Sequence, residues 1–214
     1  MSKRWKKQPL LPAREGIARQ QYAIVIRKEL FRKSIHLCSA LVPFFLTLAR
    51  IPVLIALVAA LVVYTVSEIL RLHGINIPVI SAITDAAARK RDENKFVLGP
   101  VTLVLGILSA ALLWKQIPAT VGIYALSFGD GLASVAGRLF GRVTVPLTKG
   151  KTAAGSLTCF AAIFISCFAI THSSFIALCV ASCGMLIEML PLKDFDNILI
   201  PILLGGLSQL LLHL

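Results

Sequence analysis

Seven apolar runs separated by charged connections dominate this chain of 214 residues. Each run has about 16 to 20 residues, close to the length at which a helix crosses the hydrocarbon core of a bilayer. The runs cover residues 34–49, 52–70, 96–113, 117–136, 153–170, 175–190 and 198–214. Because 57% of the residues are hydrophobic and the mean hydropathy is +0.84, a soluble domain is excluded. The sequence predicts an all-α, polytopic helical membrane protein with about seven transmembrane helices.

The distribution of lysine and arginine predicts the orientation. If the seven runs span the membrane, 20 of the 22 Lys and Arg residues lie on one side, and only Arg50 and Lys115 lie on the other. The positive-inside rule then places the N-terminus in the cytoplasm and the C-terminus outside. We expect a multi-pass protein of the cytoplasmic (inner) membrane. Topology and anionic lipid headgroups explain the net charge of +12, so no nucleic-acid partner is expected.

The composition also divides the chain. Residues 1–33 are polar and basic, and we expect a cytoplasmic arm, loose through residue 19, followed by an interfacial helix. Residues 34–214 form the transmembrane domain, in which we expect the catalytic site. Residues 77–91, in the longest connection, predict a short interfacial helix. The five cysteines lie in apolar runs without a C-x-x-C pair and read as core residues.

Asp130 is the acid that lies well inside an apolar run, between Gly129 and Gly131. It follows Ile117 by 13 residues, or about 20 Å of helix, which places it towards the cytoplasmic side. A carboxylate within a membrane segment is costly without a nearby cation, and such residues are usually functional. The flanking glycines allow close approach of a ligand or of another backbone. We therefore predict that Asp130 is the centre of a site.

A basic turn follows Asp130 and indicates phosphate binding. We expect Lys149 and Lys151 to bind a triphosphate, helped by donors at the N-terminus of the next helix. These donors are Thr152, Gly155 and Ser156. The turn is not a Walker loop, because that motif requires a glycine where this chain has Val145.

Further polar residues lie at the cytoplasmic ends of the runs. Glu29, Lys33 and His36 are spaced so that a helix presents them on one face. Asp130 and three residues of the last connection carry the oxygen ligands that suit Mg²⁺ shared with substrate phosphates. The predicted metal ligands are Asp130, Glu188, Asp196 and Asn197. Glu68 ends the second run and is either part of this site or a solvated cap.

Four ordered blocks resemble the CTP-dependent lipid-alcohol kinases, the family of dolichol kinase, phytol kinase and CTP-dependent diacylglycerol kinase. Residues 29–36 (ELFRKSIH) resemble the family's E-x-x-R-K-x-x-H start of the first span. Residues 127–141 (SFGDGLASVAGRLFG) resemble its G-D-x-x-A-x-x-x-G-x-x-x-G block. Residues 151–156 (KTAAGS) resemble K-S-x-E-G-S, and residues 188–201 (EMLPLKDFDNILIP) resemble its E-x-x-P…D-N-x-x-x-P ending. One position departs, because Ala154 stands where the family has glutamate.

The resemblance implies that CTP and Mg²⁺ bind at the cytoplasmic face and that a membrane lipid alcohol is phosphorylated there. Polyprenol or dolichol, phytol and diacylglycerol are the acceptors that the family suggests. The catalytic residues are then Asp130, His36 and Lys151, with Asp130 and His36 as rival bases. Lys33, Gly129, Gly137, Arg138 and Gly141 are then further expected nucleotide-binding residues. Glu29 and Glu68 are expected to lie beside this site.

Two other functions stay open at this point. The family is distantly similar to the CDP-diacylglycerol synthases, so phosphatidate cytidylyltransferase activity is one alternative. A small transporter or scaffold without chemistry is the other. A transport path would favour polar residues on both sides of the membrane, whereas all ten acids lie in the expected cytoplasmic half.

Overall fold

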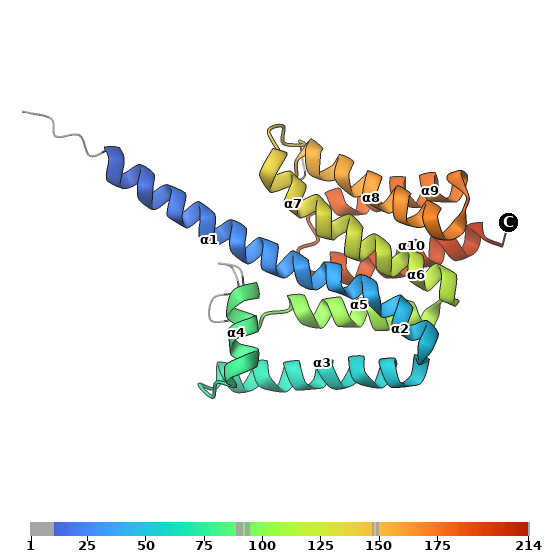
Figure 1. The fold of residues 1–214 in the computed structure, drawn as a ribbon, viewed down its shortest axis with the longest axis horizontal. Coiled ribbons are helices and arrows are strands. Elements are labelled where there is room, and N and C mark those ends of the chain that lie inside the picture. The colour runs from blue at the N-terminus through green and yellow to red at the C-terminus, as the bar shows by residue number, and fades with distance from the viewer. Residues whose placement is uncertain (1–10, 89–91, 93–94, 147, 149, 214) are drawn as a thin grey trace, which may run out of the picture.

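The structure is a computed structural model that describes residues 11–88, 92, 95–146, 148 and 150–213. In this part of the chain the regular elements are helices, and an isolated antiparallel bridge joins Thr144 to Thr152. The elements (Figure 1) are α1 (Leu11–Cys38), η1 (Ser39–Leu41), α2 (Val42–Leu48), α3 (Arg50–Leu72), α4 (Pro78–Ala87), α5 (Gly99–Leu113), α6 (Gln116–Tyr124), η3 (Ala125–Asp130), α7 (Gly131–Phe140), α8 (Ala153–Thr171), α9 (Ser174–Met189) and α10 (Asp196–Leu211). The prediction of an all-helical protein is confirmed.

Each of the seven apolar runs forms helix. Three helices are long and apolar enough to cross a membrane, namely Arg50–Leu72, the continuous stretch Gln116–Phe140, and Ala153–Thr171. The shorter apolar helices are α5, α9 and α10, and the first run forms the end of α1 with η1 and α2. The helix expected within residues 77–91 is α4.

The N-terminal segment differs from the expected loose arm. Helix α1 begins at Leu11 and continues to Cys38, so the expectation is wrong for residues 11–19. Pro12 lies in the first turn, where a helix needs no N–H donor, and therefore does not prevent the helix. Residues 1–10 lie outside the described part of the chain.

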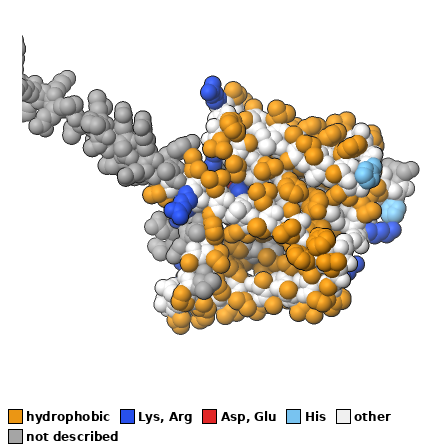
Figure 2. Space-filling model, viewed as in Figure 1, with side chains coloured by type: hydrophobic (Ala, Val, Ile, Leu, Met, Phe, Trp, Pro, Cys, Tyr) orange, Lys and Arg blue, Asp and Glu red, His pale blue; other side chains and the backbone are white. Residues whose placement is uncertain are grey.

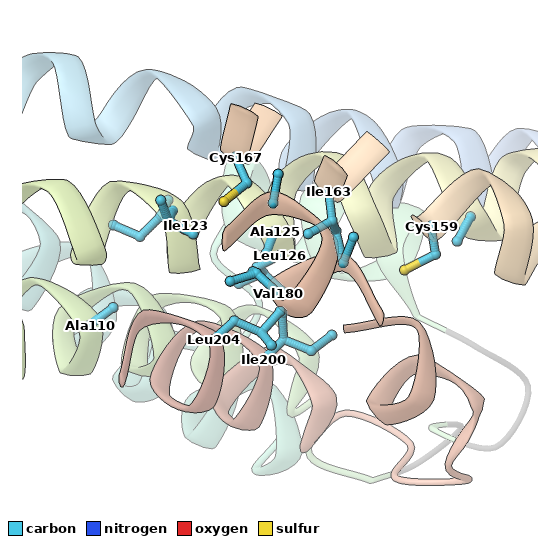
Figure 3. Close-up of a cluster of buried hydrophobic side chains, with 14 of the residues drawn as sticks. Ala110, Ile123, Ala125, Leu126, Cys159, Ile163, Cys167, Val180, Ile200 and Leu204 are labelled. Atoms are coloured by element: carbon cyan, nitrogen blue, oxygen red, sulfur yellow. The ribbon is translucent and has the colours of Figure 1, made fainter. Parts of the chain in front are cut away.

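The core is formed by residues of α5, α6, η3, α7, α8, α9 and α10. Leu126 of η3, Ile163 of α8 and Ile200 of α10 are fully buried in it (Figure 3). Cys159 and Cys167 also lie in this core and form no disulfide, as expected, although Cys38 is exposed. Close packing of apolar helices requires small residues where the backbones meet.

The close contact between α5 and α10 positions Asn197, one of the predicted site residues. Pro201 lies inside α10 and, having no N–H, leaves the carbonyl of Asn197 without its usual helical donor. Gly106 of α5 packs directly on this carbonyl, and a side chain at Gly106 would collide with it. The Asn197 side chain is thereby held beside the N-terminal half of α5, where its Nδ2 donates to Thr102 Oγ1 at 2.9 Å.

Helix α3 lies at one edge of the molecule, next to α4 (Figure 1). Only 11% of its most apolar 18-residue window is buried, and Ile51, Ile55 and Val62 are more than half exposed. Hydrophobic side chains also cover most of the face in Figure 2, with basic side chains mainly near its margins. A surface this apolar is stable in contact with lipid rather than with water. The fold is therefore that of a membrane protein.

Candidate active site

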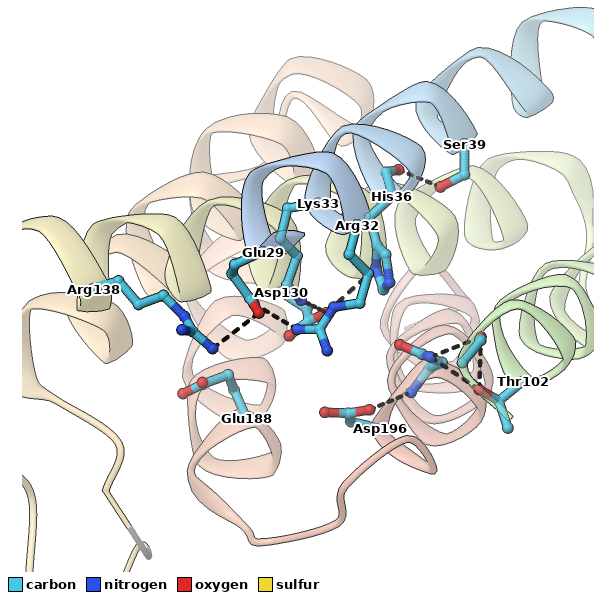
Figure 4. A network of polar contacts seen from close by, with 12 residues as sticks. Glu29, Arg32, Lys33, His36, Ser39, Thr102, Asp130, Arg138, Glu188 and Asp196 are labelled. Carbon is cyan, nitrogen blue, oxygen red and sulfur yellow. Dashed lines mark hydrogen bonds and ion pairs between the residues drawn. The ribbon is translucent and has the colours of Figure 1, made fainter. Parts of the chain in front are cut away.

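Asp130 ends a π-helical segment within the long apolar helix Gln116–Phe140. Such segments are rare and frequently occur at functional sites. The Asp130 side chain is buried, and the Lys33 ammonium of α1 forms an ion pair with its Oδ2 (Figure 4). His36 Nδ1 lies 3.3 Å from the same oxygen. The prediction that Asp130 requires a nearby cation is confirmed, and α1 supplies it.

One face of α1 carries the polar residues of the site. Glu29, Lys33 and His36 are all buried, which confirms that they share a face. Glu29 binds Arg32 on its own helix and accepts from Arg138 Nη2 of α7 at 2.9 Å. Two buried acids, Glu29 on α1 and Asp130 on the Gln116–Phe140 helix, thus tie these two helices together.

A serine pair forms a further contact between α1, η1 and the π-helical segment that Asp130 ends. Ser39 and Ser127 are buried, and their hydroxyl oxygens lie 2.6 Å apart. Ser127 also donates to the Ile123 carbonyl at 2.8 Å. Sequence reasoning missed this pair. The signal was a serine one turn before Asp130, together with a serine three residues after His36.

The basic turn forms a small hairpin before α8. Its backbone pairs where Val145 N donates to Lys151 O at 2.9 Å. Lys151 Nζ then binds Glu188 Oε1 of α9, and Ser156 Oγ lies 3.5 Å from Glu188 Oε2. Burial lowers the pKa of Lys151, but Glu188 outweighs it, and with weaker contributions from Asp130 and Asp196 the pKa is raised. Lys151 is therefore a fixed cation within electrostatic range of Asp130 and Asp196.

The backbone N–H groups at the N-terminus of α8 donate to acceptors within the protein. Thr152 caps the helix by accepting from Gly155 N at 3.2 Å. The amides of Ala153 and Ser156 donate to the carbonyls of Val143 and Thr152. These three backbone amides are therefore already bonded within the protein. Lys149 lies outside the described residues.

The predicted nucleotide-site glycines are packing positions in this structure. A side-chain carbon at Gly137 would lie 2.9 Å from Thr152 Oγ1, and one at Gly155 would lie 3.0 Å from the Ala133 carbonyl. Gly141 packs on the same threonine, and Gly129 packs on Ile163. These glycines allow α7 and η3 to approach α8, which brings Lys151 towards Asp130.

A pocket opens beside Asp130. It is narrow and open to solvent at its mouth. Lys33, His36, Asp130, Asp196 and Asn197 line it together. Burial, with the nearby Asp130 carboxylate, raises the pKa of Asp196 to about 6. Two acids therefore face a common space that also contains the Lys33 ammonium.

Two predicted residues lie apart from this pocket. Glu188 does not line it and instead binds Lys151. Glu68 binds Arg71 at 2.7 and 2.8 Å and accepts from Val97 N at 2.8 Å. Among the described residues, no three His, Cys, Asp or Glu side chains are grouped closely enough to hold a metal ion by themselves.

The fold and the site define an all-helical membrane protein with a buried, mixed-charge site inside its helices. No family model matches the chain. No solved structure matches it either.

Curated relatives give a closer assignment. Phytol kinase 1 of Arabidopsis thaliana is 31% identical over 147 residues, covering 64% of this chain and 46% of that protein. Farnesol kinase of Arabidopsis thaliana is 31% identical over 143 residues, covering 58% and 46%. CTP-dependent diacylglycerol kinase 1 of Eremothecium gossypii is 29% identical over 119 residues, covering 55% and 36%. The chain spans about half the length, or less, of these relatives. The resemblance to lipid-alcohol kinases is confirmed.

Proposed function

We propose that this protein phosphorylates a membrane lipid alcohol with CTP. The observation that carries the proposal is the buried Asp130, placed by an apolar helix at a pocket that also contains Lys33, His36, Asp196 and Asn197. Phosphoryl transfer needs mainly positioning and charge neutralisation, and this pocket offers both cations and anions at fixed places. The related phytol, farnesol and CTP-dependent diacylglycerol kinases support the same reaction class.

The reaction balances as follows. The alcohol oxygen forms a bond to the γ-phosphorus of CTP, the bond from that phosphorus to the β,γ-bridging oxygen breaks, and CDP leaves. The alcohol proton passes to His36, whose Nδ1 lies 3.3 Å from Asp130 Oδ2. A carboxylate on this side orients the ring and stabilises the imidazolium that forms. Asp130 therefore acts both on His36 and on the charge of the site.

The donor side of the site is assigned to the basic residues. We propose that Lys33, Lys151 and Arg138 bind the triphosphate, with Ser156 as a further donor. Lys149 is proposed to bind the triphosphate as well. Gly129, Gly137, Gly141, Thr152 and Gly155 support this site through the packing of η3, α7 and α8. Glu188 holds Lys151 in place, and a phosphate that replaces this carboxylate would meet the same ammonium.

Mg²⁺ fits the acidic residues of the pocket. Asp130 and Asp196, with the Asn197 amide, line one space. Mg²⁺ is usually held by one or two carboxylates and the substrate phosphates, so a complete protein cage is not required. When bound, it supplies positive charge that neutralises the transferring phosphoryl group.

The proposed topology keeps seven spans, a cytoplasmic N-terminus and a site that faces the cytoplasm at the inner membrane. The distribution of 20 and 2 basic residues supports it. We propose that residues 1–33 form a basic N-terminal part and that residues 34–214 form the catalytic membrane domain. Helix α1 crosses this boundary. Anionic headgroups are the proposed partners of the basic part, and nucleic acid is not.

A donor survey tests the function. Purified protein in lipid is incubated with each of the four nucleoside triphosphates, Mg²⁺ and a mixture of long-chain alcohols and diacylglycerol. The proposal predicts CDP and a lipid monophosphate, formed fastest with CTP and abolished by chelation of Mg²⁺. Pyrophosphate and a CDP-lipid would instead establish a cytidylyltransferase, and no turnover of any triphosphate would refute an enzyme of either kind.

A further inference from the structure

The pocket beside Asp130 has two unlike walls. One set of lining side chains, here called the polar wall, is charged or polar and includes Lys33, Asp130 and Asp196. The other set, here called the apolar wall, consists of Ile35 of α1, Val97 just before α5, and Pro100 and Leu103 of α5. A triphosphate with its cation requires polar partners, so the apolar wall is available to an apolar part of a substrate.

The apolar wall continues to the outside of the protein. Phe31, one turn before Ile35, is 39% exposed, and Leu98, next to Val97, is 43% exposed. Helices α1 and α5 line the same pocket without packing closely on each other. Outward-facing apolar side chains therefore lie next to the apolar wall on both α1 and the start of α5.

The edge of this wall is fixed by helix α3. Val97 N donates to Glu68 Oε1 at 2.8 Å, and Tyr64 donates from its hydroxyl to the Val97 carbonyl at 3.1 Å. Glu68 is buried and is held in turn by Arg71, which also donates to the Lys95 carbonyl at 2.9 Å. Both backbone groups of Val97 are thus bound to α3. A buried N–H without an acceptor would be costly, so the contact of Val97 N with Glu68 favours one position of the edge.

A second apolar pocket does not reach the site. It lies between Tyr124, Phe128 and Leu132 on one side and α8 on the other. These three residues are spaced by four along the Gln116–Phe140 helix, and Asp130 lies two residues from the nearest of them, on roughly the opposite face. Asp130 does not line this pocket. A chain bound there could not present its hydroxyl to Asp130.

We propose that the acceptor alcohol reaches Asp130 from the lipid between α1 and α5, and that Ile35, Val97 and Leu103 bind the hydrocarbon next to its hydroxyl. Glu68 is then a positioning residue, which acts through Val97. This inference rests on the proposed function, because it names the part of that site that selects the acceptor. The hydroxyl lies at the polar wall and the chain at the apolar wall.

Photo-crosslinking tests the alcohol site without any turnover. The protein in phospholipid bilayers is irradiated with a long-chain primary alcohol that carries a diazirine close to its hydroxyl, in the absence of nucleotide. We expect label on the peptides that contain Ile35 and residues 97–103, competed by unlabelled alcohol. Label confined to residues 124–132, or spread equally over all lipid-facing helices, would overturn the inference.

A pair of variants on one helix sharpens the test. Ile35→Trp should fill the apolar wall, whereas Leu30→Trp adds the same ring at a side chain that is 45% exposed and does not line the pocket. Changes of this size in an apolar pocket alter selectivity by about tenfold or more. We expect Ile35→Trp to reduce labelling of residues 97–103 about tenfold and to raise KM for the alcohol similarly, with KM for CTP unchanged. Equal behaviour of the two variants would contradict the proposal.

The positioning role of Glu68 has its own readout. Glu68→Leu removes the acceptor of Val97 N–H and should raise KM for the alcohol more than it lowers kcat, while Glu68→Gln should restore much of the affinity. A parallel loss of both constants and of CTP binding would show that Glu68 merely supports folding. If no alcohol is phosphorylated but residues 97–103 are labelled, the alcohol site stands and the kinase proposal fails.

Discussion

Replacing Asp130 by asparagine removes one negative charge from a site in which Lys33 and His36 both face the same carboxylate oxygen. The shape and the hydrogen-bonding capacity stay nearly the same. The charge that orients His36 and attracts a cation is lost. We expect turnover to fall about 10³-fold, which corresponds to about 4 kcal/mol of transition-state stabilisation.

The same substitution also has a cost in stability. Lys33 is 3% exposed, and breaking a buried ion pair by removing one partner typically costs about 3–5 kcal/mol. A loss of activity could then reflect loss of folded protein. The double variant Asp130→Asn/Lys33→Met separates the two effects, because it removes both charges and should recover most of the stability.

The assay measures thermal unfolding in detergent and initial rates with CTP for the wild type, both single variants and the double variant. We expect the double variant to unfold near the wild-type temperature and to remain inactive. Recovery of more than about a tenth of wild-type turnover in any variant that lacks Asp130 would refute the reasoning, because a 10³-fold effect is expected of a charge at the reaction centre. Asp130 would then be a packing residue.

The remaining predictions concern phosphate binding, packing and topology. Lys151→Met should raise KM for CTP at least about tenfold, as loss of a charged hydrogen bond does. Lys115→Met, at the N-cap of α6, should leave KM unchanged. Equal kinetics of the two variants would show that Lys151 does not bind CTP. Gly137→Ala should lower the unfolding temperature, because its new carbon would lie 2.9 Å from Thr152 Oγ1, at a cost of about 1–3 kcal/mol. Gly99→Ala, with open space around it, should not, and similar shifts would contradict the packing role. A reporter active only outside the cytoplasm should work at the C-terminus and fail in the loop after α9, and the reverse pattern would refute the topology.

The sequence predicted the helices well because membrane length and apolar composition define them locally. The same reasoning showed that Asp130 needs a cation and that Glu29, Lys33 and His36 share a face. It could not show that Lys33 is that cation, because the two residues are 97 positions apart and their contact depends on how α1 crosses the Gln116–Phe140 helix.

Other parts of the site were not predictable from local patterns. The glycine-rich block indicates close approach of another group, and the structure shows that the group at Gly137 is the Thr152 side chain. Glu68 ends an apolar run like many solvated caps, and only the packing of α3 against the segment before α5 shows that it binds Val97 N. The helix at residues 11–19 was missed because basic composition and Pro12 suggested a loose arm.

The fate of the CTP phosphates tests the central claim most directly. Purified protein is incubated with a long-chain alcohol, Mg²⁺ and CTP labelled with ³²P at either the γ- or the α-phosphate, and the lipid product is extracted and counted. We predict that label from the γ-position enters the lipid, that label from the α-position stays in CDP, and that Asp130→Asn transfers neither at a significant rate. Transfer of the α-label to the lipid, or equal transfer of the γ-label by the wild type and Asp130→Asn, would contradict a kinase site built around Asp130.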